Sequence, residues 1–324
     1  MYTTAQLQEK INNYIAEIPF VKEPVELYKP IEYVMLMGGK RVRPVLMLLA
    51  YNLFNEDISL SLAPASGIEI FHNYTLLHDD LMDRANMRRG KETVHKVWGD
   101  NTAILSGDAM FVLACQYIAK TPAFCLKEVL DLFNHTALEV CEGQQYDVDF
   151  EKRDDVTADE YIEMIRLKTA VLLAAAVKIG AFLGNASAKD AELLYKFGIN
   201  IGLAFQLKDD YLDVYGDPVV FGKNLGGDIL CNKKTFMLIK AFELADEKQI
   251  KNLNFWINKL NFESEEKIKA VTDLYNEIGV KEVCENKMAE YYNGAIEVLD
   301  KVSVDEYRKN ELKKLVQELM YRQQ

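Results

Sequence analysis

The stretch AELLYKFGINIGLAFQLKDDYLD (residues 191–213) indicates which kind of fold this 324-residue chain adopts. Its apolar side chains recur at intervals of three and four residues, as on one face of an α-helix; they are Leu193, Leu194, Phe197, Ile201, Ala204 and Phe205. No proline occurs between Pro122 and Pro218, which allows long uninterrupted helices there. Strict alternation over a strand's length is rare throughout the chain. The sequence therefore predicts an all-α protein.

The composition predicts one large domain over residues 1–324, because no Gly/Ser-rich linker, low-complexity tract or change of composition divides the chain. A hydrophobic content of 49% is sufficient for a substantial core. The formal net charge of -12 argues against general attraction to nucleic acid or to an anionic membrane surface. A phosphate ligand would therefore need a local basic cluster or metal ions.

The cysteines and the apolar runs predict a cytoplasmic protein. Met1 to Gln6 carry no basic stretch or apolar run of a signal peptide. The apolar runs Val45–Phe54 and Ala170–Gly184 are too short or, at Lys178, interrupted, so no stable membrane insertion is expected. The five cysteines are odd in number and widely spaced, which fits neither a disulfide framework nor a CxxC zinc site. We expect buried thiols in a reducing compartment at Cys115, Cys125, Cys141, Cys231 and Cys284.

Two aspartate clusters share one spacing: DDLMD at residues 79–83 and DDYLD at residues 209–213. In a helix the first and last aspartates of each cluster lie on one face, about 6 Å apart along the axis. Two unit charges at ~4 Å repel by roughly 4 kcal/mol at an effective dielectric of about 20. Magnesium relieves this repulsion and takes further ligands from substrate phosphates, so two such faces could hold a diphosphate between them. The alternative is a solvated acidic surface, against which the surrounding Leu76, Leu77, Leu81, Phe205, Leu207 and Leu212 argue.

Basic residues near the aspartates supply what an acidic protein needs to hold diphosphates. His72 and Glu69 lie close to the Asp79 stripe of the same predicted helix, so His72 is either a core histidine or, on this polar face, a donor lining a cavity. GGKRVRP (38–44) places cations beside a flexible glycine pair and a helix-starting proline. The other basic segments are RRGK (88–91), Lys168-Thr169, and GKNLGGD (222–228) with Lys233. Each alone is typical of a surface turn; their joint occurrence favours a diphosphate site.

At these residues the chain resembles the trans-isoprenyl diphosphate synthases, the polyprenyl synthetase family, which includes farnesyl and geranylgeranyl diphosphate synthases. The matching segments are residues 38–44, 78–83, 88–90, 107–108, 143–144, 168–169, 205–213 and 222–235. Glu92 departs from the family, which usually has proline there, and the C-terminal residues 320–324 are less basic than in some relatives.

The resemblance implies a single large helical bundle of the isoprenoid synthase type around a central apolar cavity, and a homodimer. It implies a short-chain prenyltransferase that joins isopentenyl diphosphate to dimethylallyl, geranyl or farnesyl diphosphate. Mg²⁺ would be the cofactor, three ions per active site, with Asp79, Asp83 and Asp209 as its ligands. Asp80, Asp210 and Asp213 would act as outer-shell or water-mediated partners.

The resemblance also assigns substrate-binding roles. Arg88, Lys168 and Lys223 would stabilise the departing diphosphate, and Thr169 and Gln206 would face the allylic cation. Isopentenyl diphosphate would be anchored by Lys40, Arg43, His72 and Arg89, and Lys233 would also bind substrate.

Product length is expected to depend on the helix that bears the first aspartate cluster. Tyr74 and Thr75, five and four residues before Asp79, resemble geranylgeranyl diphosphate synthases, and Phe71 lies about 12 Å below Asp79, where it could form a floor. A C20 product is therefore favoured over C15. A class I terpene cyclase and a catalytically silent synthase subunit are the alternatives; the second aspartate cluster argues against both.

Overall fold

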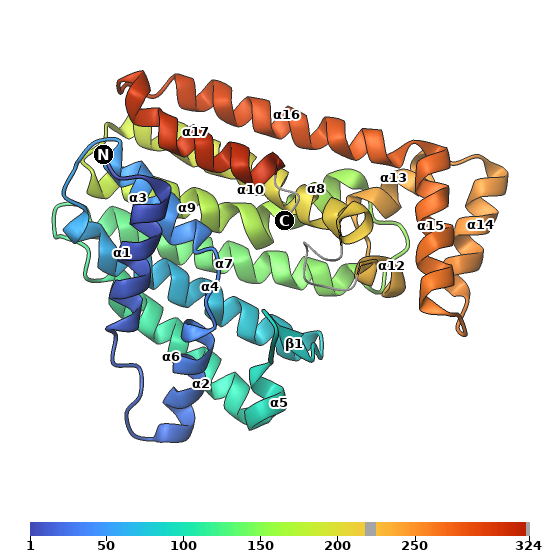
Figure 1. The fold of residues 1–324 in the computed structure, drawn as a ribbon, viewed down its shortest axis with the longest axis horizontal. Coiled ribbons are helices and arrows are strands. Elements are labelled where there is room, and N and C mark those ends of the chain that lie inside the picture. Colours follow the sequence, from blue (N-terminus) through green and yellow to red (C-terminus); the bar gives the residue numbers. More distant parts are fainter. Residues whose placement is uncertain (218–224, 322–324) are drawn as a thin grey trace. The chain divides into compact units, whose positions relative to one another are not determined.

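The structure is a computed structural model that describes residues 1–217 and 225–321, and the regular secondary structure of these residues is helical apart from one two-stranded hairpin (Figure 1). The prediction of an all-α protein is confirmed. The elements are α1 (Thr4–Ala16), α2 (Val25–Leu36), α3 (Val42–Asn52), η1 (Ile58–Ser61), α4 (Leu62–Met82), β1 (Met87–Arg88), β2 (Lys91–Glu92), α5 (Val94–Trp98), α6 (Asp100–Ile118), α7 (Leu126–Phe150), α8 (Ala158–Ile165), η2 (Arg166–Ala170), α9 (Val171–Leu183), α10 (Ala188–Tyr215), α12 (Gly227–Leu230), α13 (Phe236–Leu244), α14 (Glu247–Asn258), α15 (Ser264–Ile278), α16 (Val280–Asp300) and α17 (Glu306–Tyr321).

The chain divides into two compact units. The first unit contains Met1–His135, Ala175–Tyr195 and Val302–Leu312; the second contains Thr136–Ala174, Lys196–Lys301 and Lys313–Gln324. The single domain over residues 1–324 stays a prediction.

In the first unit, α4 packs against α6, with α3, α2 and α1 as further neighbours. Every residue of α4 from Pro64 to Phe71 is buried, so this half of the helix is enclosed on all sides. Pro64 is tolerated because it lies in the first turn, where its missing N–H would have no helical partner. The C-terminal half of α4 thus extends from a rigid, enclosed base.

The hairpin that follows α4 places two arginines of the first unit. Met87 pairs with Glu92 and Arg88 with Lys91, which leaves Arg89 and Gly90 as the two turn residues. Both have positive φ, 52° and 74°, as a tight hairpin turn requires. The hairpin therefore carries Arg88 at the end of β1 and Arg89 in the turn, just beyond α4.

In the second unit, a buried apolar cluster joins α8, α13, α15 and α16 to the C-terminal part of α10. α8 begins with a capping box in which Thr157 and Glu160 satisfy each other's backbone N–H groups. α14 begins with a similar box at Asp246 and Gln249 and packs against α15 (Figure 1). This core supports the C-terminal turns of α10, which carry the second aspartate cluster.

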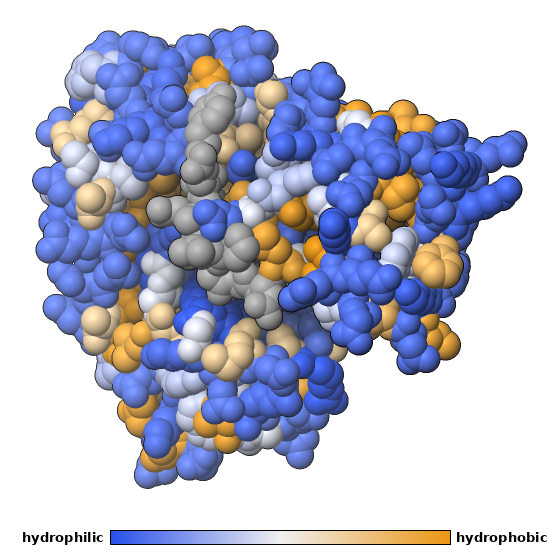
Figure 2. Space-filling model, turned by 45° about the vertical axis from the view of Figure 1, so that its right-hand side comes forward, coloured by the Kyte–Doolittle hydropathy of each residue, from blue (hydrophilic) through white to orange (hydrophobic). Residues whose placement is uncertain are grey.

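Hydrophilic residues cover most of the face drawn in Figure 2, as the charge of the chain leads one to expect. The prediction of five buried thiols is wrong in part: Cys125 and Cys284 are buried, Cys115 on α6 is half-buried, and Cys141 on α7 and Cys231 after α12 are exposed. Among residues 1–217 and 225–321, no helix has both the length and the apolar character needed to cross a membrane.

Candidate active site

The first aspartate cluster ends α4, in the first unit. Asp79 and Asp80 lie in its last turn, and Asp83 is its C-cap and is exposed. Asp80 is buried, and Nε of Arg88 donates to both of its carboxylate oxygens, at 2.7 and 2.8 Å. Arg88 Nη2 also lies 3.7 Å from Asp79 Oδ2. Burial raises the pKa of Asp80 to about 6 against the opposing effect of Arg88. Asp80 therefore anchors a cation beside Asp79.

The second aspartate cluster lies on α10, in the second unit. Asp210 is buried, and its two oxygens accept hydrogen bonds from the Tyr161 hydroxyl and from Gln206 Nε2, the latter at 3.0 Å. Gln206 Oε1 accepts from the Thr169 hydroxyl at 3.0 Å, so Thr169, Gln206, Asp210 and Tyr161 form one chain. Burial, together with Asp228, raises the pKa of Asp210. Asp210 orients Gln206 and Thr169 and is itself enclosed.

Asp213 accepts hydrogen bonds from backbone N–H groups, whereas Asp210 accepts them from side chains. Asp213 Oδ2 accepts the backbone N–H of Asp228 at 3.0 Å, and its carbonyl accepts that of Gly226 at 2.6 Å. Gly226 adopts a φ of 79°, which is open to glycine without strain. Asp213 therefore fixes the segment that leads into α12.

Lys168 and Thr169 lie in η2, a π-helical interruption between α8 and α9. Such interruptions are frequent at functional sites. A Cβ atom at Gly143 would lie 2.3 Å from the backbone nitrogen of Lys168, so only glycine allows α7 to pass so close to η2. Lys168 Nζ lies 2.6 Å from Asp147 Oδ2, and Lys233 Nζ lies 3.7 Å from the same oxygen. Asp147 thus holds two of the predicted diphosphate-binding cations together.

Asp147 itself remains charged in this arrangement. Burial raises its pKa, but the two ammonium groups outweigh burial and hold the pKa below its ordinary value. Lys168 and Lys233, both predicted to bind substrate, therefore lie beside one charged carboxylate in the second unit.

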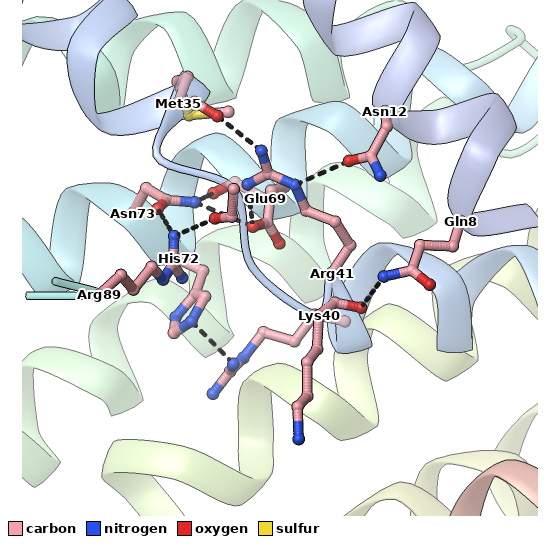
Figure 3. Close-up of polar contacts among 11 residues, drawn as sticks. Gln8, Asn12, Met35, Lys40, Arg41, Glu69, His72, Asn73 and Arg89 are labelled. Carbon is pink, nitrogen blue, oxygen red and sulfur yellow. Dashed lines mark hydrogen bonds and ion pairs between the residues drawn. The ribbon is translucent and has the colours of Figure 1, made fainter. Parts of the chain in front are cut away.

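The cations predicted for isopentenyl diphosphate gather around α4 and the 38–43 segment in the first unit (Figure 3). Arg43 Nη1 lies 2.9 Å from His72 Nε2. Burial is the main cause that holds the pKa of His72 well below its ordinary value. The positive charges of four arginines add to this effect; these arginines are Arg43, Arg89, Arg88 and Arg41. His72 is therefore neutral at pH 7, with Nε2 accepting from Arg43. Arg89 is exposed and donates to the Gly38 carbonyl at 2.6 Å.

An aromatic cluster lies below the first aspartate cluster. Phe71 is fully buried, and its ring centroid lies 5.5 Å from that of Tyr74, 6.0 Å from Phe111 and 5.3 Å from Phe133. Tyr74 also lies 5.6 Å from Phe111. Thr75 donates its hydroxyl to the His72 carbonyl at 2.8 Å. Phe71 and Tyr74, the two predicted length-setting aromatics, therefore belong to one packed group.

One predicted site residue, Lys223, lies outside the described residues, as do Gly222 and Asn224. Sequence reasoning missed several residues that contact the predicted ones. Arg41 stands inside the 38–44 segment and Asn73 directly follows His72, so position alone could have drawn attention to them. No sequence signal distinguishes the others, which are Phe111, Phe133, Asp147 and Tyr161.

The predicted metal ligands are hard carboxylate oxygens, which suit magnesium. Within the described parts of the chain, no three Cys, His, Asp or Glu side chains gather closely enough to hold a metal ion by themselves. Magnesium usually keeps several waters and takes ligands from substrate phosphates. The residues therefore fit an ion that binds together with a diphosphate.

Comparisons with known proteins agree on one family. A family model described as "Polyprenyl synthetase" matches residues 24–275. A geranylgeranyl diphosphate synthase of Methanosarcina mazei is 44% identical over 232 residues, 71% of each chain. A crystal structure of a geranylgeranyl pyrophosphate synthase superposes with a TM-score of 0.95 at 40% identity over 99% of each chain. Another such enzyme, from Corynebacterium glutamicum, was solved with isoprenyl diphosphate and magnesium; its TM-score is 0.86 at 25% identity over 98% of each chain.

Proposed function

This chain belongs to the polyprenyl synthetase family, and we propose that it condenses isopentenyl diphosphate with allylic diphosphates to give geranylgeranyl diphosphate. It is a prenyltransferase of the short-chain, trans-condensing type. The observation that carries the proposal is that α4 carries residues of both predicted substrate sites. The helix bears His72 of the predicted isopentenyl diphosphate site and, two turns later and about 10 Å along its axis, Asp79 of the predicted allylic site.

The first step is the breaking of the C–O bond between the allylic group and its diphosphate. When bound at Asp79, Asp83 and Asp209, magnesium would neutralise the negative charge that grows on the leaving diphosphate. We assign to Arg88 and Lys168 the role of stabilising the same negative charge on the leaving diphosphate. Asp80 holds Arg88 in place, and Asp147 holds Lys168.

The second step joins the two substrates. Lys40, Arg43, His72 and Arg89 would hold the isopentenyl diphosphate, with His72 as a neutral donor and acceptor. The hydroxyl of Thr169 and the amide of Gln206, fixed by Asp210, would direct their dipoles towards the allylic cation. The double bond of isopentenyl diphosphate attacks that cation, and the departed diphosphate accepts the proton lost in forming the new double bond.

The test is turnover by the purified chain alone. With magnesium, labelled isopentenyl diphosphate and dimethylallyl, geranyl or farnesyl diphosphate in turn, we expect label in a C20 alcohol after phosphatase treatment. Asp79→Asn is the inactive control. A terpene cyclase would release a hydrocarbon without needing isopentenyl diphosphate, and a silent subunit would incorporate no label; either result would refute the proposal.

We also propose that the protein is a homodimer located in the cytoplasm. α6 exposes three large apolar side chains, Ile104, Leu105 and Val112, that a second copy would bury. Light scattering should give twice the mass of the chain at micromolar concentration, and Leu105→Glu with Val112→Glu should lower it. An active wild-type monomer would contradict the dimer. Cell fractionation tests the location.

A further inference from the structure

A chain of polar contacts inside the first unit links α4 to the hairpin turn (Figure 3). Glu69 Oε1 accepts from Arg41 Nη1 at 2.8 Å and from Asn73 Nδ2 at 3.0 Å. Asn73 Oδ1 in turn accepts from Arg89 Nη1 at 3.3 Å, and the same nitrogen of Arg89 donates to the Gly38 carbonyl at 2.6 Å. The contacts therefore run from Arg41 through Glu69 and Asn73 to Arg89 and end on the segment that carries Arg41.

Arg41 differs from the other cations of the 38–44 segment because its side chain turns inward. It is 5% exposed, and besides Glu69 it donates to the Met35 carbonyl at 2.6 Å and to Asn12 Oδ1 at 3.2 Å. Its φ of 50° lies in the left-handed region, which an arginine rarely adopts. In Figure 3 the Lys40 side chain points away from this group. The inward anchoring of Arg41 thus fixes the backbone from which Lys40 and Arg43 project.

Glu69 and Asn73 are 2% and 1% exposed, so neither side chain is open to a ligand. A buried carboxylate needs a partner, because an uncompensated charge in the interior is strongly unfavourable. Arg41 supplies that partner and ties the 38–44 segment to α4. Asn73, which directly follows His72 on α4, then extends the same anchor to the exposed Arg89.

The segment also closes around Arg89 from the other side. A Cβ atom at Gly39 would lie 3.0 Å from Cζ of Arg89, so the backbone passes directly against the guanidinium. Gly39 has a φ of 133°, a conformation that L side chains rarely adopt. The position of Arg89 is therefore set by Asn73, by the Gly38 carbonyl and by the glycine backbone together.

We propose that Glu69 and Asn73 are positioning residues for the isopentenyl diphosphate site: without touching substrate, they hold the Lys40–Arg43 backbone and the Arg89 guanidinium in one geometry. This inference rests on the proposed function, because it takes Lys40, Arg43 and Arg89 as the ligands of that diphosphate. Cations that are already fixed bind a diphosphate without first losing side-chain freedom. Loosening them should therefore weaken the binding of isopentenyl diphosphate and leave the binding of the allylic substrate unchanged.

Asn73→Ala is the sharpest variant, because it removes the link between Glu69 and Arg89 and leaves the Arg41–Glu69 pair intact. We expect the KM for isopentenyl diphosphate to rise about tenfold, the effect of one hydrogen bond to a charged group. The KM for the allylic substrate and kcat should change by less than about threefold. Calorimetric titration with isopentenyl diphosphate alone should show the same loss of affinity.

Asn52→Ala is the matched control. Asn52 is an equally buried asparagine of the first unit, but its side chain accepts from the Tyr2 N–H and donates to the Asn55 carbonyl, each at 2.8 Å, and neither partner is one of the predicted cations. It should lower the melting temperature and leave both KM values unchanged. If Asn73→Ala does not fold, Asn73→Leu keeps a branched side chain of similar shape that neither donates to Glu69 nor accepts from Arg89, and it should show the same selective rise.

Three outcomes distinguish a failure of the positioning role from a failure of the proposed isopentenyl diphosphate site. An Asn73→Ala enzyme with an unchanged KM for isopentenyl diphosphate, or with both KM values raised equally, would overturn the positioning role. If Arg43→Ala raises this KM and the Asn73 variants do not, only the positioning role fails. If Arg43→Ala itself leaves the KM unchanged, the proposed isopentenyl diphosphate site fails and the positioning role falls with it.

Discussion

Nε of Arg88 donates to both carboxylate oxygens of Asp80, at 2.7 and 2.8 Å. The second aspartate of the first cluster therefore binds an arginine and is not exposed to solvent. The bond orients the remaining guanidinium nitrogens, one of which lies 3.7 Å from Asp79. Asp80 therefore acts on the proposed reaction through the position of Arg88.

Replacing Arg88 by alanine should lower kcat by about a hundredfold, because a preorganised cation is lost and Asp80 is left buried with a less favourable charge. Arg88→Lys should recover part of the loss, since it keeps the charge without the planar fork. Steady-state turnover of labelled isopentenyl diphosphate measures both. Arg84→Ala, which breaks only the exposed pair with Asp100, is the control and should stay within about twofold of wild type. Equal losses at Arg84 and Arg88 would contradict the assignment.

Metal removal should abolish activity without unfolding the chain. Excess chelator should stop turnover and added Mg²⁺ should restore it, whereas a melting curve recorded without substrate should move little, because the ion binds with diphosphate. Asp79→Ala and Asp209→Ala should each lower kcat by about three orders of magnitude or more at an unchanged melting temperature. Full activity in excess chelator would rule out the metal-dependent mechanism.

Product length should respond to the aromatic cluster of the first unit. Phe71→Ala and Tyr74→Ala should lengthen the main product beyond C20, because each removes a ring from the packed group below Asp79, and Thr75→Phe should shorten it towards C15. Phe111→Ala should lengthen it as well, since Phe111 contacts both Phe71 and Tyr74. Chromatography of the dephosphorylated products measures the distribution.

The control for product length is Phe124→Ala, which removes an exposed ring outside the cluster and should change nothing. If none of the four cluster variants shifts the distribution, this helix does not set the product length.

Stability should depend on pH through His72. Its pKa is lower in the folded chain than the ordinary value of 6.5, so the unfolded chain binds the proton more readily. The contribution of neutral His72 is complete above pH 6.5 and is lost as the pH falls from there towards its folded pKa. Urea unfolding at pH 7.5 and 5.5 should show a smaller loss of unfolding free energy for His72→Gln than for wild type. His135→Gln, at an exposed histidine, should behave as wild type; equal losses in all three proteins would refute the prediction.

The sequence by itself determined the helical class and the local geometry of each cluster. The spacing of Leu193, Phe197 and Ile201 and the four-residue spacing of Asp79 and Asp83 follow from the helical repeat alone. The glycine pair and cations of residues 38–44 were likewise visible as a local pattern. The family resemblance, drawn from these motifs, is confirmed by the comparisons.

Tertiary structure alone decided how these residues are used. Arg41 and Arg43 are two residues apart and chemically equal, yet only the packing of α3 on α4 shows that Arg41 turns inward to Glu69. Lys168 meets Asp147 across 21 residues, and Tyr161 meets Asp210 across 49. Such pairs depend on where separate helices pack, whereas a helical repeat fixes only neighbours three and four residues apart. Local spacing therefore determines which groups share a face, and helix packing determines which of them pair with residues distant in sequence.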